Sequence, residues 1–218
     1  MGASSRARKG NALKPVKICG ITRKEDALSA AYSGVHAIGF VFYAGSPRHV
    51  DPGRASEIAR ALPPFISTVG LFVNPEKIEV EKVISEVRLD LLQFHGEEEE
   101  DFCSMFSIPY IKAARVKPDL DLVQYAACYT SAKGILLDAF VEGVEGGTGK
   151  TFDWSLIPHG LPLPVILSGG LNPENVTEAI LKVDPWAVDV SSGVESSKGI
   201  KDAGKMAAFM QGVKKADV

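Results

Sequence analysis

Short runs of β-branched and aliphatic residues recur along this chain, and their starts are mostly 20 to 30 residues apart. Amphipathic segments separate most of these runs. Strands that alternate with helices in this way predict a parallel sheet with right-handed crossovers. The strand-like runs are 16–20, 36–42, 67–73, 90–96, 110–116, 134–140, 164–170 and 187–193.

Two architectures fit this alternation, an open doubly wound sheet and a closed (β/α)8 barrel. An open sheet usually has fewer strands and one dominant glycine-rich turn after the first strand. Here the first turn reads CGIT, without a GxGxxG pattern. Polar side chains or glycines instead end most of the runs, as the active site of a barrel requires. We therefore expect an α/β protein with a closed, parallel (β/α)8 sheet, the TIM barrel.

Several helix ends are also predicted. Thr22 is expected to cap the first helix, and Gly34 to end it. The Asn-Pro pairs at 74–75 and 172–173 are expected to begin two more, with proline at the first helical position in the second pair. Apolar residues at helical spacing predict a last helix over about 198–215.

The length and composition favour one domain. The 218 residues are 45% hydrophobic, which is enough for one full-sized core. Residues 1–14 are basic and poor in apolar side chains, so we expect a flexible extension there and a single barrel domain over 15–218. The extension lacks the apolar stretch of a secretory signal. A net charge of −3 argues against a nucleic-acid partner, and no apolar run approaches the length of about 20 residues that spans a bilayer.

Cysteine usage indicates a reducing compartment. The three cysteines, Cys19, Cys103 and Cys128, are an odd number without CxxC spacing. This pattern argues against a disulfide framework and against a zinc site. We expect a cytoplasmic protein with no metal.

Alternate residues of a strand face opposite sides of its sheet, so the strand ends can be sorted into faces. The residues that share a face are Lys17 with Cys19, Gln93 with His95, Leu136 with Asp138, and Asp189 with Ser191. If these faces point into a barrel, one mouth gathers a thiol, an imidazole and two carboxylates. Such a set can perform acid/base catalysis.

Each member of this set also has a simpler interpretation. Cys19 alone would more often be a small buried apolar residue, although a cation such as Lys17 lowers the pKa of a thiol. His95 is either functional or a loop residue hydrogen-bonded to backbone. Asp138 favours function, because a carboxylate after an apolar run is costly to bury without a partner or a task. For Asp189, capping of a neighbouring loop is the alternative.

Arg48 follows the second strand-like run in the tripeptide SPR. Its planar guanidinium is suited to clamp a carboxylate. An ordinary surface arginine in a turn is the alternative, and the residue pattern does not decide between them.

Two late glycine turns predict a phosphate site. Gly169 and Gly170 end one strand shortly before a helix, and Ser191, Ser192 and Gly193 follow the last strand. Glycines let backbone N–H groups approach a ligand, and helix N-termini favour anions. In barrels the loops after strands seven and eight often bind phosphate. A phosphate ester is therefore the expected ligand, with two ordinary tight turns as the alternative.

The segment GVEGGTGKT, residues 143–151, looks like a nucleotide-binding P-loop but departs from the pattern. A P-loop requires glycine at position 144, where this chain has Val144. We interpret the segment as a mobile loop over the barrel mouth, with conformational freedom from glycines that include Gly147. Gly147 is expected among the substrate-binding residues.

Taken together, these motifs resemble the phosphoribosylanthranilate isomerase family of tryptophan biosynthesis. The resemblance covers about residues 16–204 and departs from the family only in the N-terminal extension. The matching segments are KICGIT (17–22), GFVFY and SPR (39–43 and 46–48), VGLFVN (69–74), LLQFHG (91–96), ILLDAF (135–140), GGTGKTFDW (146–154), LSGGLNPENV (167–176), and DVSSGVE (189–195) followed by GIKD (199–202).

The resemblance implies a (β/α)8 barrel and an Amadori rearrangement without cofactor or metal. The implied reaction converts N-(5-phospho-β-D-ribosyl)anthranilate to 1-(2-carboxyphenylamino)-1-deoxy-D-ribulose 5-phosphate. Asp138 matches the general acid and Cys19 the general base of the family. Arg48 matches the residue that holds the anthranilate carboxylate, and Asp189 the one that binds sugar hydroxyls. The two glycine turns would hold the phosphate, and His95 would lie near the ligand.

Two other functions compete with this one. One is catalysis by a different phosphate-binding barrel, such as a pentose-phosphate epimerase, which would not be expected to carry CGIT, SPR and LDAF together. The other is a non-catalytic sugar-phosphate binder, which replacement of Cys19 or Asp138 would favour; both are present. We expect a small phosphorylated aminosugar as the partner of a monomer or homodimer, and a second aminoaldose substrate remains open.

Overall fold

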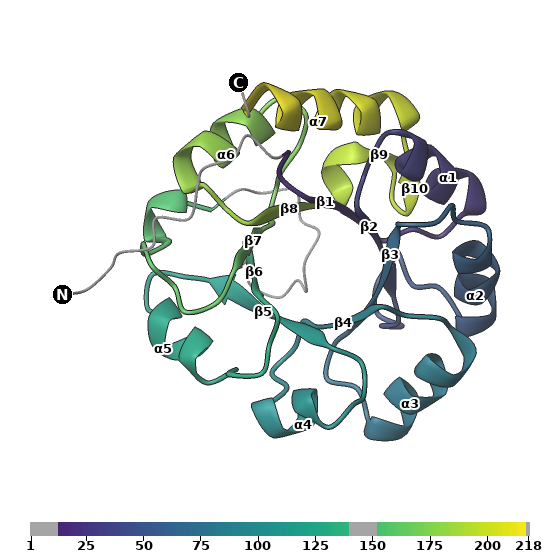
Figure 1. Cartoon of the computed structure of the whole chain (residues 1–218), viewed down its shortest axis with the longest axis horizontal. Coiled ribbons are helices and arrows are strands. Elements are labelled where there is room, and N and C mark those ends of the chain that lie inside the picture. The colour runs from purple at the N-terminus through teal and green to yellow at the C-terminus, as the bar shows by residue number, and fades with distance from the viewer. Residues whose placement is uncertain (1–12, 140–151, 217–218) are drawn as a thin grey trace.

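The computed structural model describes residues 13–139 and 152–216. Eight parallel strands close into a barrel in sequence order, with β8 beside β1 (Figure 1). The predicted (β/α)8 barrel is confirmed, and each expected run contains one strand. The strands are β1 (Val16–Cys19), β2 (Ala37–Val41), β3 (Ser67–Phe72), β4 (Leu91–Phe94), β5 (Tyr110–Val116), β6 (Ile135–Ala139), β7 (Val165–Leu167) and β8 (Ala187–Val190).

The α-helices form a ring around the barrel (Figure 1). Short 3-10 helices, η1 (Trp154–Leu156) and η2 (Ser192–Val194), follow β6 and β8. The α-helices are α1 (Lys24–Tyr32), α2 (Pro52–Arg60), α3 (Lys77–Glu86), α4 (Glu100–Ser104), α5 (Leu122–Ala127), α6 (Val176–Val183) and α7 (Ala203–Ala216).

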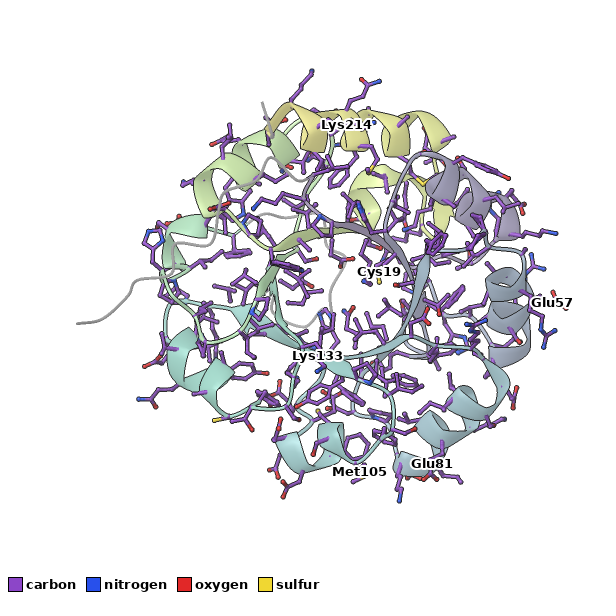
Figure 2. The ribbon with its side chains drawn as sticks, viewed as in Figure 1. Cys19, Glu57, Glu81, Met105, Lys133 and Lys214 are labelled. Carbon is purple, nitrogen blue, oxygen red and sulfur yellow. The ribbon has the colours of Figure 1, made fainter. Side chains whose placement is uncertain are left out.

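The main core lies between the barrel and the helices. Ile18 and Phe40 point outward from their strands into this layer, where they belong to one buried cluster with Phe209 of α7. The inward residues are different in kind: Lys17 and Cys19 alternate with Val16 and Ile18 on β1. Figure 2 shows Cys19 at the centre of the barrel. Because side chains alternate along a strand, β1 presents one pair to the outer core and the other pair to the barrel interior.

Several predicted helix ends differ from the structure. Thr22 does not cap α1, because its hydroxyl donates to the carbonyl of Gly199, 2.6 Å away, and Arg23 is the N-cap residue. Gly34 does end that helix, with a φ of +90°. Pro173 lies in a turn, and α6 begins at Val176.

The predicted helix over 198–215 was wrong in its first turn. Residues 195–201 form a hairpin of β9 (Glu195–Ser197) and β10 (Ile200–Lys201), and α7 begins only at Ala203. Ile200 fits the helical spacing of the sequence but lies in the hairpin. Buried polar contacts of Glu195 and Lys201 favour the hairpin over the local helical pattern.

The described chain begins at the edge of the expected extension. Leu13 packs against the main core, and the ammonium of Lys14 lies 2.8 Å from the carboxylate of Asp184. Residues 1–12 lie outside the described residues. Among the described helices, none has the length and apolar character needed to cross a membrane.

Candidate active site

The carboxyl ends of the strands surround one pocket at the barrel mouth. Nine of the predicted site residues line it: Cys19, Arg48, His95, Asp138, Gly169, Gly170, Asp189, Ser191 and Ser192. Two predicted residues are not among them. Gly193 lies against the backbone of Leu171, where a β-carbon would come within 1.9 Å of the carbonyl oxygen. Gly147 lies outside the described residues.

Cys19 sits on the side of the mouth formed by β1 and β8, beside a buried ion pair. The ammonium of Lys17 lies 2.7 Å from the carboxylate of Asp189, and the Ser168 hydroxyl donates to the second carboxylate oxygen at 3.2 Å. Gly39 of β2 leaves room for the thiol, because a β-carbon there would approach Sγ to 2.8 Å. Asp189 is thus held by Lys17, a partner that sequence analysis did not assign to it.

Burial controls the thiol more strongly than its neighbours do. Burial raises the pKa of Cys19 above its ordinary value, and the positive charge of Lys17 opposes this rise without cancelling it. For Lys17 the balance is reversed: burial lowers its pKa, but Asp189 and Cys19 outweigh burial and the pKa is raised. The Lys17 ammonium thus favours the thiolate form of Cys19, and burial disfavours that form more strongly.

Asp138 lies on β6, at one end of a hydrogen-bonded chain. Its Oδ1 accepts a hydrogen bond of 2.8 Å from the backbone N–H of Ala139, and its Oδ2 lies 3.2 Å from Nε2 of His95. The other ring nitrogen of His95 lies 2.9 Å from the side-chain amide of Gln93. Gln93 also lines the pocket and has a buried oxygen without a partner among the described residues.

Sequence analysis did not select Gln93 as a site residue. The signal that could have found it is its position on β4, two residues before His95 and therefore on the same face. The structure shows that this shared face points into the mouth.

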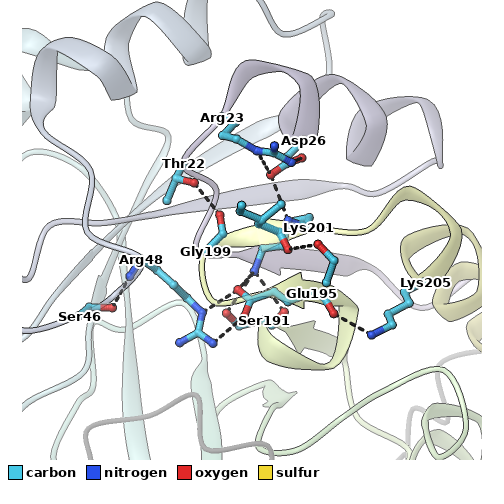
Figure 3. A network of polar contacts seen from close by, with 12 residues as sticks. Thr22, Arg23, Asp26, Ser46, Arg48, Ser191, Glu195, Gly199, Lys201 and Lys205 are labelled. Carbon is cyan, nitrogen blue, oxygen red and sulfur yellow. Dashed lines mark hydrogen bonds and ion pairs between the residues drawn. The ribbon is translucent and has the colours of Figure 1, made fainter.

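Arg48 is held at both ends of its side chain. Its stem crosses Gly20, where a β-carbon would approach Cδ to 2.5 Å. Its head forms a two-point ion pair with Glu195, with Nε and Nη2 each 2.8 Å from a carboxylate oxygen (Figure 3). Lys201 donates to the same carboxylate at 2.8 Å. Arg48 does clamp a carboxylate, but in this structure the carboxylate belongs to the protein.

Burial raises the pKa of Glu195, but the hydrogen bonds of Arg48 and the charge of Lys201 outweigh burial and hold the pKa below its usual range. Sequence analysis missed both Glu195 and Lys201. Both lie in the segments 189–195 and 199–202 that resemble the family, but no local pattern links them to Arg48, which lies about 150 residues earlier in the chain.

The turn after β7 depends on its glycines. Gly169 and Gly170 have φ values of +81° and +68°. A β-carbon on Gly169 would come within 2.5 Å of the backbone nitrogen of Ala139. The side chain of Asn175 donates to the carbonyl of Gly170 and fixes the turn before α6. The turn therefore brings its backbone close to Asp138 and lines the pocket.

Comparison with known proteins decides the family. The model of the family described as N-(5'phosphoribosyl)anthranilate (PRA) isomerase matches residues 16–212. This chain belongs to that family. A phosphoribosylanthranilate isomerase of Nitrosospira multiformis is 61% identical over 198 residues, which are 91% of this chain and 95% of the relative.

Solved isomerase structures agree. Monomers made from the dimeric isomerase of Thermotoga maritima share 42% identity and a TM-score of 0.81, covering 93% of this chain and 99% of theirs. An isomerase in complex with reduced 1-(o-carboxyphenylamino)-1-deoxyribulose 5-phosphate shares 44% identity, the same coverage and a TM-score of 0.81. The predicted family, the isomerase activity and the place in tryptophan biosynthesis are confirmed.

Proposed function

We propose that this isomerase carries out its Amadori rearrangement with Asp138 as general acid and Cys19 as general base. The observation that carries the proposal is their placement. The two side chains line one pocket from β6 and β1, with only β7 and β8 between these strands on one side of the barrel. A substrate bound between them can gain a proton from one and lose a proton to the other.

Ring opening is the step assigned to Asp138. Its carboxyl donates a proton to the furanose oxygen of N-(5′-phosphoribosyl)anthranilate as the bond from C1′ to that oxygen breaks. The electron pair of that bond becomes the new hydroxyl, and the anthranilate nitrogen forms a protonated Schiff base with C1′. His95, 3.2 Å from Asp138, fixes the orientation of the carboxyl group.

Proton removal is the step assigned to Cys19. The thiolate takes the proton from C2′, and the electron pair moves toward the Schiff base to give an enolamine. Tautomerisation then places a proton on C1′ and a ketone at C2′, so the product is an isomer of the substrate. Burial raises the pKa of the thiol, so the thiolate needs support from Lys17 and from the positive Schiff base nitrogen next to C2′.

The two ends of the substrate are assigned to opposite parts of the pocket. Arg48 would bind the anthranilate carboxylate with the edge of its guanidinium that Glu195 does not occupy. Backbone N–H groups of the turn at Gly169 and Gly170, together with Ser191 and Ser192, would hold the phosphate. Asp189 would accept hydrogen bonds from sugar hydroxyls.

Substitution of the two proton-transfer residues tests the assignment. Cys19→Ala and Asp138→Asn should each lower kcat by about 10²-fold or more, the low end for lost acid/base catalysis. The measurement is the loss of substrate fluorescence in purified protein without added cofactor. Near-normal turnover in either folded variant would overturn that residue's role.

The remaining parts of the proposal concern the whole protein. Residues 15–218 form one domain that acts in the cytoplasm on a small phosphorylated aminosugar, without cofactor, as a monomer or homodimer. The dimeric relative from Thermotoga maritima supports the homodimer as one of these states. Light scattering of the purified chain would distinguish the two.

A further inference from the structure

Two buried charged side chains lie behind Arg48 and form a triad with it, and the proposed mechanism uses neither of these two. Arg48 lines the pocket, whereas Glu195 of β9 and Lys201 of β10 lie behind it (Figure 3). All three residues are at most 8% exposed. The hairpin that carries Glu195 and Lys201 joins η2, after β8, to α7, and an isomerase barrel needs neither of its strands to close.

Glu195 is anchored from several directions. Both of its carboxylate oxygens accept hydrogen bonds from Arg48, and Oε1 also accepts one from Lys201. Its backbone carbonyl accepts a hydrogen bond of 2.7 Å from Nζ of Lys205. A carboxylate fixed in this way holds the guanidinium in one orientation, because two parallel hydrogen bonds define the plane of the fork.

All three N–H bonds of the Lys201 ammonium have acceptors in the same network. Its ammonium donates to Glu195 at 2.8 Å, to the backbone carbonyl of Ser191 at 3.1 Å and to the Ser191 hydroxyl at 3.4 Å. Three acceptors match the three N–H bonds of an ammonium group. The network therefore connects Arg48 to Ser191, which lines the pocket after β8.

The triad is not neutral. Arg48 and Lys201 share the single carboxylate of Glu195, which leaves one positive charge in excess while Lys201 is protonated. Burial lowers the pKa of Lys201, and Glu195 opposes that fall. The nearby pair of Lys17 and Asp189 is neutral. Buried charge without a counter-charge is costly, so the site is set up to receive one negative charge.

The guanidinium of Arg48 has a second edge that can bind a negatively charged group. Glu195 occupies Nε and one N–H of Nη2. Nη1 has no hydrogen-bond partner in the described part of the chain, and with Nη2 it forms a second pair of parallel donors. Arg48 lines the pocket, so this edge is within reach of a ligand there.

We propose that Glu195 is a positioning residue that holds Arg48 so that its second edge meets the substrate carboxylate, and that Lys201 preserves the net positive charge there. The inference rests on the proposed role of Arg48. It makes the β9–β10 hairpin a determinant of specificity: an aminosugar phosphate without a carboxylate gains nothing from the triad.

A double-mutant cycle tests the proposal with two ligand probes. One probe is reduced 1-(o-carboxyphenylamino)-1-deoxyribulose 5-phosphate, which carries both the carboxylate and the phosphate. The other is inorganic phosphate. The variants are Glu195→Gln, Arg48→Ala and the double variant, with Glu57→Gln as the matched control because Glu57 pairs with Arg54 on the exposed surface.

Glu195→Gln should raise the Kd of the reduced analogue about ten- to hundredfold, the range for a lost hydrogen bond between charged groups. The loss of the fixed guanidinium orientation should outweigh the extra positive charge that the substitution leaves at the site. The Kd of inorganic phosphate should change much less, since Lys201 keeps its hydrogen bonds to Ser191. Arg48→Ala should have a similar or larger effect, and Glu195→Gln should add little in the Arg48→Ala background, because its effect passes through Arg48. Glu57→Gln should change neither Kd.

Three results would overturn the proposal. Equal weakening of both probes by Glu195→Gln would indicate a general structural role, and additive effects in the double variant would show that Glu195 does not act through Arg48. No effect of Arg48→Ala on the analogue would refute the proposed role of Arg48 itself, which separates that failure from the other two. If Glu195→Gln does not fold, Glu195→Asp, which keeps the charge and moves the fork, replaces it in the same cycle.

Discussion

Two buried clusters of charge in this barrel have opposite surroundings. The triad of Arg48, Glu195 and Lys201 adjoins the active-site pocket. The second cluster, Lys112 of β5 with Glu98, lies on the outer side of the barrel wall. There Nζ of Lys112 donates to the carbonyl of Gly96 at 2.6 Å and lies 3.3 Å from the Glu98 carboxylate.

The cluster of Lys112 and Glu98 is neutral, and its charged groups are surrounded by protein. The ammonium of Lys112 lies near the rings of Tyr125 and Tyr129, at 5.9 and 5.5 Å from their centroids. The carboxylate of Glu98 accepts hydrogen bonds from the backbone N–H groups of Asn74 and Gly96, which ties the loops after β3 and β4 together. Burial lowers the pKa of Lys112, and Glu98 opposes that fall.

The comparison shows that burial of a charge does not by itself mark a functional site. Lys112 is completely buried, yet it pairs with the carboxylate of Glu98 and does not line the pocket at the barrel mouth. The triad is equally buried, but it carries an excess charge and one of its members lines the mouth. We infer that Lys112 and Glu98 hold the fold, whereas the triad prepares a binding site.

The largest effect that separates the two clusters is expected from Lys112→Met. Removing the ammonium leaves Glu98 buried without its counter-charge, which should cost about 3–5 kcal/mol of unfolding free energy. Urea unfolding measures this loss, and the KM of the folded variant should stay near that of the unchanged protein. A large rise in KM with little loss of stability would indicate that Lys112 serves the binding site and not the fold. If Lys112→Met does not fold, Glu98→Gln provides a milder test of the same pair.

A second effect concerns alkaline pH. Cys103 contacts the same cluster, and burial raises its pKa from 9.0 to about 12. Between these values the unfolded chain has lost the thiol proton and the folded chain has kept it, so stability falls as pH rises. Unfolding free energies measured from pH 8 upward should fall less steeply in Cys103→Ala. An identical slope in the variant would contradict the raised pKa.

A smaller effect is expected beside the thiol of Cys19. The positive charge of Lys17 lowers the pKa of Cys19 against the effect of burial. Lys17→Met should therefore raise this pKa further, because the thiolate loses a nearby positive charge. Ultraviolet absorbance of the thiolate, corrected with Cys19→Ala in the same background, measures the shift. A pKa that stays constant or falls would show that Lys17 does not influence the thiol.

The sequence predicted the barrel and the mouth because both follow from local patterns. Alternation within each strand assigned Lys17 with Cys19, and Leu136 with Asp138, to shared faces, and the barrel closes with Cys19 and Asp138 at one pocket. The glycine turn at 169–170 was predicted for the same reason: its positive φ values belong to the turn itself.

The triad could not be predicted, because its contacts join distant parts of the chain. Arg48 and Glu195 meet only when the barrel closes between β8 and β1. The helical spacing around Ile200 also gave a wrong prediction, because it indicated a helix where the chain forms the hairpin that buries Lys201. The prediction that Thr22 caps α1 was wrong for a related reason. Its hydroxyl donates a hydrogen bond to the carbonyl of Gly199, which lies near the other end of the sequence.

The proposed roles of Cys19 as general base and Asp138 as general acid are tested most directly with substrate deuterated at C2′ in single-turnover reactions. In Cys19→Ala, removal of the C2′ proton should limit the rate, and the primary isotope effect should be larger than in the unchanged enzyme. In Asp138→Asn, ring opening should limit the rate, and the isotope effect should disappear. An isotope effect that persists in Asp138→Asn and vanishes in Cys19→Ala would contradict the assignment.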